Sequence, residues 1–249
     1  MSFSYQLYSS RNYPPLSSTV KMLSDLGYSA VEGYGGLFDN MDAVNALKAE
    51  LDANGLQMRS THIGLDMVED DPELALEIAK TLGIKSLYVP FIMPDDRPST
   101  AQGWRDLGAR IEAAGKPLVA AGHGFGYHNH DFEFVETDGA IPMEELLKGG
   151  PTLEWEVDVA WVVRGASDPI AWIEKFSDRI TAAHVKDIAQ AGECADEDGW
   201  ADVGHGTMDW ASIMNALRKT PAQHFVMEHD NPNDEQRFAS RSIASANSY

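Results

Sequence analysis

Short apolar runs alternate along the chain with stretches whose apolar residues recur at helical spacing. Residues 4–8 form the first predicted strand, and the spacing of Val20, Leu23 and Leu26 predicts a helix over 16–26 that Gly27 would end. Further strands are predicted at 29–32, 56–62, 85–90, 124–130, 153–158, 180–186 and 224–228. Further helices are predicted at 41–53, 71–82, 99–114, 143–147, 169–176 and 210–218, and a short one after 237. Eight strands alternating with helices through short connections favour parallel crossovers.

This alternation predicts a mixed α/β fold, a single (β/α)8 TIM barrel that spans residues 1–249 as one domain. The length agrees with the roughly 250 residues typical of such barrels. A doubly wound open sheet is the competing architecture, but it usually has a glycine-rich turn after its first strand. Residues 9–12 read Ser-Ser-Arg-Asn instead. The acidic segment 189–205 is expected to be an extended loop after the seventh strand.

The net charge of the chain limits the classes of molecule that it is expected to bind. A net charge of -20, from 39 acidic and 19 basic residues, disfavours a nucleic acid or an anionic membrane surface as partner. A single cysteine, Cys194, cannot form an internal disulfide. Neither a signal-peptide pattern nor an apolar run of membrane-spanning length is present in the sequence. We therefore expect a cytoplasmic protein with a small-molecule substrate.

Carboxylates and imidazoles follow the predicted strands at their C-terminal ends, where barrels place catalytic groups. These residues are Glu32, His62, His128, His130, Asp158, His184 and Glu228. Strand alternation puts His128 and His130 on one side, and likewise Glu156 and Asp158. A mixture of nitrogen and oxygen ligands suits one divalent ion such as Mn, Zn, Co or Mg.

Several of these residues have a second interpretation. His62 is either a ligand or a group that contacts substrate or packs, and Lys186 either stabilises an anion or forms a surface ion pair. Asp187 either orients His184 or caps a helix. Trp161 is either a packing residue or a platform for a sugar ring.

Eight short motifs carry a resemblance to a known family. They are QLYSSRN at 6–12, GYSAVEGYG at 27–35, YHNHDFEF at 127–134, VDVAWV at 157–162, DP at 168–169, HVKD at 184–187, GHGTMDW at 204–210 and MEHD at 227–230. In this order and spacing the chain resembles the sugar phosphate isomerase/epimerase family of xylose isomerase-like barrels. The resemblance covers nearly the whole length.

The resemblance implies a metal site formed by His128, Asp158, His184 and Glu228. Many family members have a Glu-Asn-His run where this chain reads His128-Asn129-His130, so His128 takes the position of a ligand that is usually a glutamate. That departure puts the symmetric two-base epimerase scheme in doubt. Trp161 stands where the ketose epimerases have a substrate-contacting histidine, which points to another substrate. Substrate contacts are expected from Glu32, His62, His130 and Trp161.

The implied chemistry is proton removal next to a carbonyl of a sugar or cyclitol, through an enediolate that a divalent ion stabilises. Glu228 is the expected base, with His128, Glu156 or Glu133 as a second proton carrier and Lys186 beside the anion. We therefore expect a metal-dependent isomerase or epimerase. The alternative is a lyase or dehydratase acting on a keto-sugar, keto-glycoside or inosose.

Two further alternatives belong to other functional classes. A nuclease of the endonuclease IV type shares the barrel but needs several metals and a basic surface, and the net charge of -20 opposes this. A non-catalytic sugar-binding barrel would not need Asp158, His184 and Glu228 together. A homo-oligomer is possible by the same resemblance.

Overall fold

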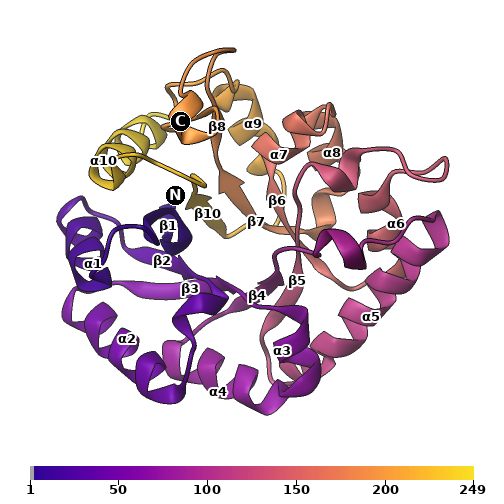
Figure 1. Cartoon of the computed structure of the whole chain (residues 1–249), viewed down its shortest axis with the longest axis horizontal. Coiled ribbons are helices and arrows are strands. Elements are labelled where there is room, and N and C mark those ends of the chain that lie inside the picture. The colour runs from indigo at the N-terminus through magenta and orange to yellow at the C-terminus, as the bar shows by residue number, and fades with distance from the viewer. Residues whose placement is uncertain (1–2) are drawn as a thin grey trace.

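The computed structural model describes residues 3–249, whose main feature is a closed barrel of parallel strands (Figure 1). Its strands are β1 (Phe3–Gln6), β2 (Ala30–Gly33), β3 (Gln57–His62), β4 (Ser86–Val89), β5 (Gly124–His128), β6 (Glu154–Asp158), β7 (Ile180–Val185) and β10 (His224–Met227). They pair in the order β1-β10-β7-β6-β5-β4-β3-β2, and β1 closes the ring against β2. The predicted barrel is therefore confirmed.

Helices surround the barrel and cover the outer side of its strands (Figure 1). They are α1 (Leu16–Asp25), α2 (Met41–Ala53), α3 (Leu65–Asp70), α4 (Pro72–Leu82), α5 (Ala101–Ala120), α6 (Pro142–Gly149), α7 (Val159–Arg164), α8 (Pro169–Lys175), α9 (Trp210–Leu217) and α10 (Glu235–Ala246). Across residues 3–249, none of the helices combines the length and the apolar character that a membrane crossing requires.

The alternation of side chains along each strand separates the apolar core from the polar barrel interior. On β6, Trp155 and Val157 belong to the hydrophobic core, whereas Glu156 and Asp158 between and beside them are buried polar residues. On β7, Val185 joins the core and His184 does not. Because successive side chains of a strand point to opposite faces, the polar members face the axis of the barrel.

Several predicted element boundaries were wrong; the fifth strand, for example, ends at His128 and not at residue 130. The first strand stops at Gln6, because the Gln6 side chain accepts a hydrogen bond from the Tyr8 backbone N–H and starts a 3-10 turn over Leu7–Ser10. The fifth helix continues past Gly115 to Ala120. Gly115 therefore lies inside the helix, and the close packing of Phe125 requires glycine there, since an added Cβ would lie 2.0 Å from Cδ1 of that ring.

The expected loop at 189–205 contains short regular structure. Strand β8 (Asp187–Ile188) pairs with β9 (Trp200–Ala201) in an antiparallel two-stranded sheet. The Asp187 carboxylate accepts hydrogen bonds from Trp210 Nε1 and from the backbone N–H groups of Gly204, Gly206 and Met208. Asp187 therefore organises the return of the chain from this segment to α9, and the prediction that it orients His184 was wrong.

Candidate functional site

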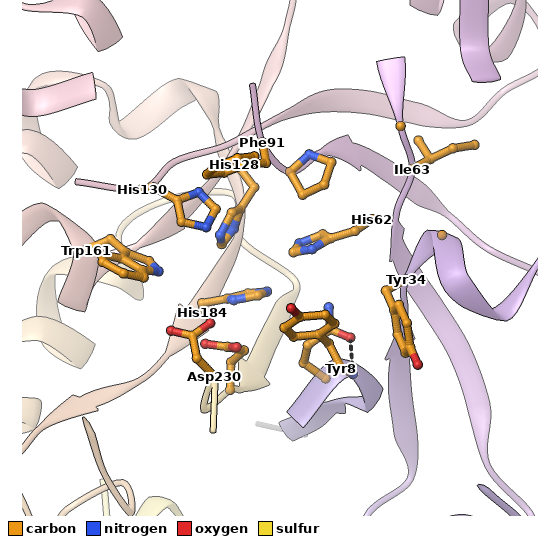
Figure 2. Close-up of a pocket in the computed structure, with 15 residues that line it drawn as sticks. Tyr8, Tyr34, His62, Ile63, Phe91, His128, His130, Trp161, His184 and Asp230 are labelled. Carbon is orange, nitrogen blue, oxygen red and sulfur yellow. Dashed lines mark hydrogen bonds between the residues drawn. The ribbon is translucent and has the colours of Figure 1, made fainter. Parts of the chain in front are cut away.

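A cavity of about 430 Å³ opens at the C-terminal ends of the strands (Figure 2). Six residues expected at the site from the sequence line it, namely His62, His128, His130, Trp161, His184 and Glu228. Glu32, Glu156, Asp158 and Lys186 are buried beside or beneath these residues and are not among the lining groups. These four side chains therefore lie behind the groups that form the cavity surface.

One cluster of potential metal ligands consists of Asp158, His184 and Glu228, whose ligand atoms lie within 4.8 Å of one another. The Asp158 Oδ2 and His184 Nδ1 atoms are buried and have no hydrogen-bond partner. Their separation is 3.8 Å, which is too long for a direct hydrogen bond. Two buried atoms that carry a free electron pair thus lie close together without a hydrogen-bond partner, as the ligand atoms of a cation do.

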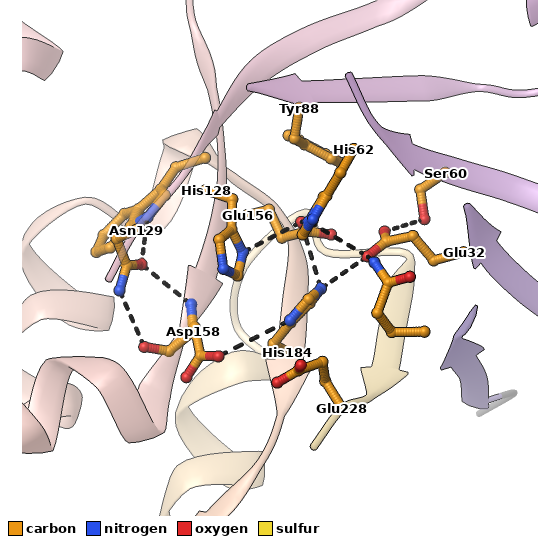
Figure 3. Close-up of polar contacts among 12 residues, drawn as sticks. Glu32, Ser60, His62, Tyr88, His128, Asn129, Glu156, Asp158, His184 and Glu228 are labelled. Atoms are coloured by element: carbon orange, nitrogen blue, oxygen red, sulfur yellow. Dashed lines mark hydrogen bonds and ion pairs between the residues drawn. The ribbon is translucent and has the colours of Figure 1, made fainter. Parts of the chain in front are cut away.

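A second cluster joins His62, His128 and Glu156 to His184, again with ligand atoms within 4.8 Å of one another (Figure 3). His62 Nε2 lies 2.7 Å from Glu156 Oε2, and His128 Nδ1 lies 3.3 Å from the same oxygen. The contact of His128 Nδ1 lacks hydrogen-bond alignment, so this nitrogen has no hydrogen-bond partner. The other oxygen of Glu156, Oε1, is also buried without one. The structure therefore places His128 with this cluster, while Asp158, His184 and Glu228 form the first one.

Hydrogen bonds fix the orientation of His184. Its Nε2 atom lies 2.7 Å from Glu32 Oε1, and Gln6 Nε2 donates to the same oxygen at 2.7 Å. Ser60 Oγ donates to the other Glu32 oxygen. When a carboxylate accepts the Nε2–H of a histidine, the Nδ1 atom keeps a free electron pair. Metal-binding histidines are commonly oriented in this way.

Hydrogen bonds also fix the orientation of Asp158. Its Oδ1 atom accepts the backbone N–H groups of Ala160 and Trp161, both at 2.9 Å, and so caps the N-terminus of α7. The Asn129 side chain accepts the Asp158 backbone N–H at 3.0 Å and donates to its carbonyl oxygen at 3.1 Å. One carboxylate oxygen is thus committed to the helix, and Oδ2 remains free to act as a ligand.

Lys186 is fully buried between two acids, so the surface ion pair considered for it was wrong. Its Nζ atom lies 2.7 Å from Glu228 Oε2, in an ion pair without hydrogen-bond alignment, and it also donates to Asp230. The ammonium lies 4.7 Å from the ring centroid of Trp161 and 3.9 Å from that of Trp200. The two indole rings shield the ion pair from water and add cation–π contacts.

Burial sets the protonation of these groups. Burial and the nearby Asp230 raise the pKa of Glu228 to about 7, although Lys186 opposes this rise. Burial also lowers the pKa of His62 to about 4 and that of His128 well below its ordinary value. Neutral imidazoles are the form that binds a metal. His62 and His128 are therefore ready to act as ligands near neutral pH. The pKa of His184 is instead raised, because the Glu32 carboxylate and the other nearby acids outweigh the effect of burial.

The donor set fits a divalent cation. Four buried carboxylates and the partly buried Asp230 surround the cavity floor, and Lys186 is the buried ammonium that faces them. The four buried acids are Glu32, Glu156, Asp158 and Glu228. Concentrated negative charge without an equal number of cations is costly to bury. Burial accordingly raises the pKa of Glu156, Asp158 and Glu228. A divalent ion at the unpartnered nitrogen and oxygen atoms would stabilise the ionised carboxylates.

The cavity walls include groups that the sequence analysis did not single out. Tyr8 and Tyr34 form one wall, where their rings meet edge to face at 5.3 Å, and Phe91 lies against His130 on the other side. Asp230 also lines the cavity. Asp230 follows Glu228 by two residues, so the alternation rule applied past the end of the strand would have found it. Tyr8 lies in the 3-10 turn after β1 and Tyr34 just beyond β2, so strand alternation does not place their side chains.

Comparison with known proteins agrees with the fold. The structure is similar to a sugar phosphate isomerase/epimerase from Parabacteroides distasonis, with 21% identity, a TM-score of 0.82, and coverage of 98% of this chain and 92% of that chain. It is also similar to the probable 3-DHS dehydratase AsbF from Bacillus anthracis, with 15% identity, a TM-score of 0.74, and coverage of 99% of both chains.

A third similar structure is the IolI protein with a bound zinc atom, at 14% identity and a TM-score of 0.72, covering 100% of this chain and 96% of that chain. No protein of curated function shows a significant sequence match. A family model described as xylose isomerase-like TIM barrel matches residues 20–246. The chain therefore belongs to the family of xylose isomerase-like TIM barrels.

Proposed function

We propose that this protein is a divalent-metal-dependent isomerase or epimerase that removes a proton next to the carbonyl of a sugar-like substrate. The observation that carries the proposal is the position of Glu228, which lines the cavity and belongs to the ligand cluster with Asp158 and His184. A carboxylate next to a cation site is where a base for such a proton is needed. The similarity to structures of sugar phosphate isomerase/epimerases supports the same class of reaction.

Asp158, His184 and Glu228 would hold the ion, which when bound would polarise the substrate carbonyl and stabilise negative charge on its oxygen. Glu228 takes the proton from the adjacent carbon while the electron pair moves to the carbonyl oxygen. Lys186 holds the Glu228 carboxylate in place through their 2.7 Å contact. Return of the proton to the neighbouring carbon, with transfer of the hydroxyl proton to the former carbonyl oxygen, completes an isomerisation. An epimerisation instead needs a second proton donor on the other face of the same carbon.

The shape and lining of the cavity favour a polyhydroxylated ring or chain. Its volume of about 430 Å³ lies in the range of small-molecule sites. Aromatic rings of Tyr8, Tyr34, Phe91 and Trp161 line the walls, and imidazoles line the floor. Aromatic faces pack against the C–H faces of sugars, whereas imidazoles and carboxylates bind hydroxyl groups.

A lyase is the second candidate, and one observation favours it. The two carboxylates that line the cavity, Glu228 and Asp230, come from the same strand end, whereas the side formed by β3 and β5 offers imidazoles. Burial depresses the pKa of the His62 and His128 imidazoles, which makes them weak bases. Proton removal from one face followed by loss of a β-substituent needs one base. The similarity to a probable dehydratase is consistent with this reaction.

Incubation in heavy water tests both candidates. The metal-loaded protein is given ketoses, inososes and 3-keto-glycosides, and products are followed by NMR and mass spectrometry. Deuterium at carbon without loss of water or aglycone identifies an isomerase or epimerase, and release of either identifies a lyase. Glu228→Gln should lower the turnover rate by about 10²–10⁴-fold. Full activity of that variant would disprove Glu228 as the base.

A further inference from the structure

A second cavity, of about 530 Å³, lies at the opposite end of the barrel from the candidate catalytic site. It opens at the N-terminal ends of the strands, because three of its lining residues mark strand beginnings. Gln57 is the first residue of β3, Lys85 directly precedes β4, and His224 is the first residue of β10. TIM barrels place their catalytic groups at the other end. A ligand of this cavity would therefore be distinct from the substrate of the proposed function.

The charge of this cavity is opposite to that of the whole chain. Lys48, Arg59 and Lys85 line it, and within residues 3–249 the one carboxylate among the lining groups is that of Asp52. Three cations and one anion give this cavity a formal charge of +2 in a chain whose net charge is -20. A concave site with an excess of positive charge attracts and concentrates anions.

The backbone places two of these cations side by side. The Lys85 backbone N–H donates to the Arg59 carbonyl oxygen at 2.8 Å, so the two residues are neighbours on adjoining strands. Arg59 Nε donates to the Gln57 side-chain oxygen at 3.2 Å. Lys48 forms an ion pair with Asp52. The Lys85 ammonium, by contrast, has neither a hydrogen bond nor an ion pair within the part of the chain that the structure describes.

His224 adds a buried polar group with no partner. Its side chain lines the cavity although the residue is only 7% exposed, and its Nδ1 atom is buried without a hydrogen-bond partner. Burial, assisted by the charge of Arg59, lowers the pKa of this imidazole, although Glu32 opposes the effect. The neutral ring carries one proton, and a buried N–H without an acceptor is rare. The proton therefore belongs on Nε2, which can donate it to a ligand in the cavity.

Apolar side chains form the rest of the lining. They are the buried residues Leu51, Leu56, Met58 and Leu82. A ligand that fills this cavity therefore has an apolar or ring-shaped part next to its anionic group. A phosphate monoester carries a charge of about -1.5 to -2 near pH 7, which matches the charge of the cavity better than the single charge of a carboxylate does.

We infer that this cavity is a binding site for a small organic phosphate monoester, held by Arg59, Lys85 and His224. The ammonium and the guanidinium pair with phosphate oxygens in charge-assisted hydrogen bonds, and the imidazole N–H donates a further one. The organic part of the ligand packs against the four apolar side chains. The inference is independent of the proposed function, because none of these residues lines the cavity at the C-terminal ends of the strands.

Titration calorimetry of the full chain with phenyl phosphate tests the inference. We expect binding that phenol, which lacks the anionic group, does not reproduce. Lys85→Ala and Arg59→Gln should each weaken the binding about tenfold, since each removes a charged partner of the phosphate group. Lys116→Ala is the matched control, because it removes an exposed lysine outside the cavity, and it should bind like the wild type.

The wild-type protein also gives a readout that does not depend on the folding of a variant. In NMR spectra of the histidine rings, phenyl phosphate should shift the signal of His224 and leave that of His130, in the other cavity, in place. A shift of His130 alone would overturn the inference, because the ligand would then bind at the opposite end of the barrel. Equal affinity of the wild type and Lys85→Ala, or no binding at millimolar phenyl phosphate, would also overturn it. All of these outcomes leave the proposed function intact.

Discussion

Across the β5–β6 ladder His128 stands directly opposite Glu156, and His128 Nδ1 lies 3.3 Å from Glu156 Oε2. In the resemblance that the motifs carry, the strand-five position belongs to a glutamate ligand, and here an imidazole occupies it. The carboxylate is instead supplied by the neighbouring strand at the same level of the barrel. The pair thus retains one carboxylate and adds an imidazole at the cavity floor.

This pairing makes Glu156 a positioning residue for the proposed chemistry. Glu156→Gln replaces one of the carboxyl oxygens that His62 and His128 face with an amide NH₂ group, and we expect catalytic efficiency and metal affinity to fall by about 10–100-fold. Glu154→Gln is the matched control, since Glu154 is on the same strand but accepts from Thr181 Oγ1 at 2.9 Å. Titration calorimetry with Mn²⁺ measures the difference. Equal affinity in both variants would contradict the role of Glu156.

The buried Lys186 ion pairs should matter for stability. Lys186→Met leaves Glu228 and Asp230 without their ammonium partner, and breaking a buried pair in this way costs about 3–5 kcal/mol of unfolding free energy. Urea denaturation followed by circular dichroism measures this loss. The double variant Lys186→Met with Glu228→Gln should recover part of it, because one uncompensated charge is gone. A single variant as stable as wild type would rule out this electrostatic account.

Asp187 should control the order of the segment between β8 and α9. Asp187→Asn replaces an acceptor-only carboxylate with an amide, and loss of hydrogen bonds to Gly204, Gly206 and Trp210 should cost about 1–3 kcal/mol. Hydrogen exchange should accelerate in residues 188–208 and remain unchanged in α2. Unchanged exchange in 188–208 would show that other contacts hold this segment.

Much of this architecture follows from the sequence, because the period of apolar residues differs between strand and helix. All eight barrel strands and the C-terminal ends that carry Glu32, His62, His184 and Glu228 were predicted. The short helices α3 and α7 were not, since six residues are too few to establish a helical period. Features that depend on burial and on side-chain pairing could not be predicted from the sequence. Lys186 is an example, because its partners Glu228 and Asp230 lie just beyond the end of another strand.

The division of the candidate ligands into two clusters could not be predicted from the sequence. Strand ends specify which side chains meet at the mouth of the barrel, but they do not specify depth along its axis. His128 was predicted with Asp158, His184 and Glu228, and the structure groups it with His184 and also with His62 and Glu156. The register of β5 against β6, which aligns His128 with Glu156, is a tertiary property that one sequence does not display.

Glu133 should make stability depend on pH. Burial raises its pKa from 4.5 to about 7, although Tyr127 and the His130 backbone N–H donate hydrogen bonds to it. A carboxyl with a higher pKa when folded binds its proton more tightly in the folded state. Its contribution is therefore complete below about pH 4.5 and is lost as the pH rises through about 7.

We therefore expect wild-type unfolding free energy to fall between about pH 5 and pH 8 more steeply than that of Glu133→Gln. The amide of this variant loses one hydrogen bond at every pH, so the comparison concerns the slope and not the absolute stability. Urea titrations across this range measure both slopes. Parallel curves for the two proteins would exclude Glu133 as the titrating group.

The central claim is that Asp158, His184 and Glu228 bind a divalent cation at the cavity floor. The most direct measurement is anomalous diffraction at the manganese edge from crystals soaked in Mn²⁺. The account predicts a peak within about 2.0–2.3 Å of Asp158 Oδ2, His184 Nδ1 and a Glu228 carboxylate oxygen. Fully soaked crystals that show no peak at these three atoms would contradict it.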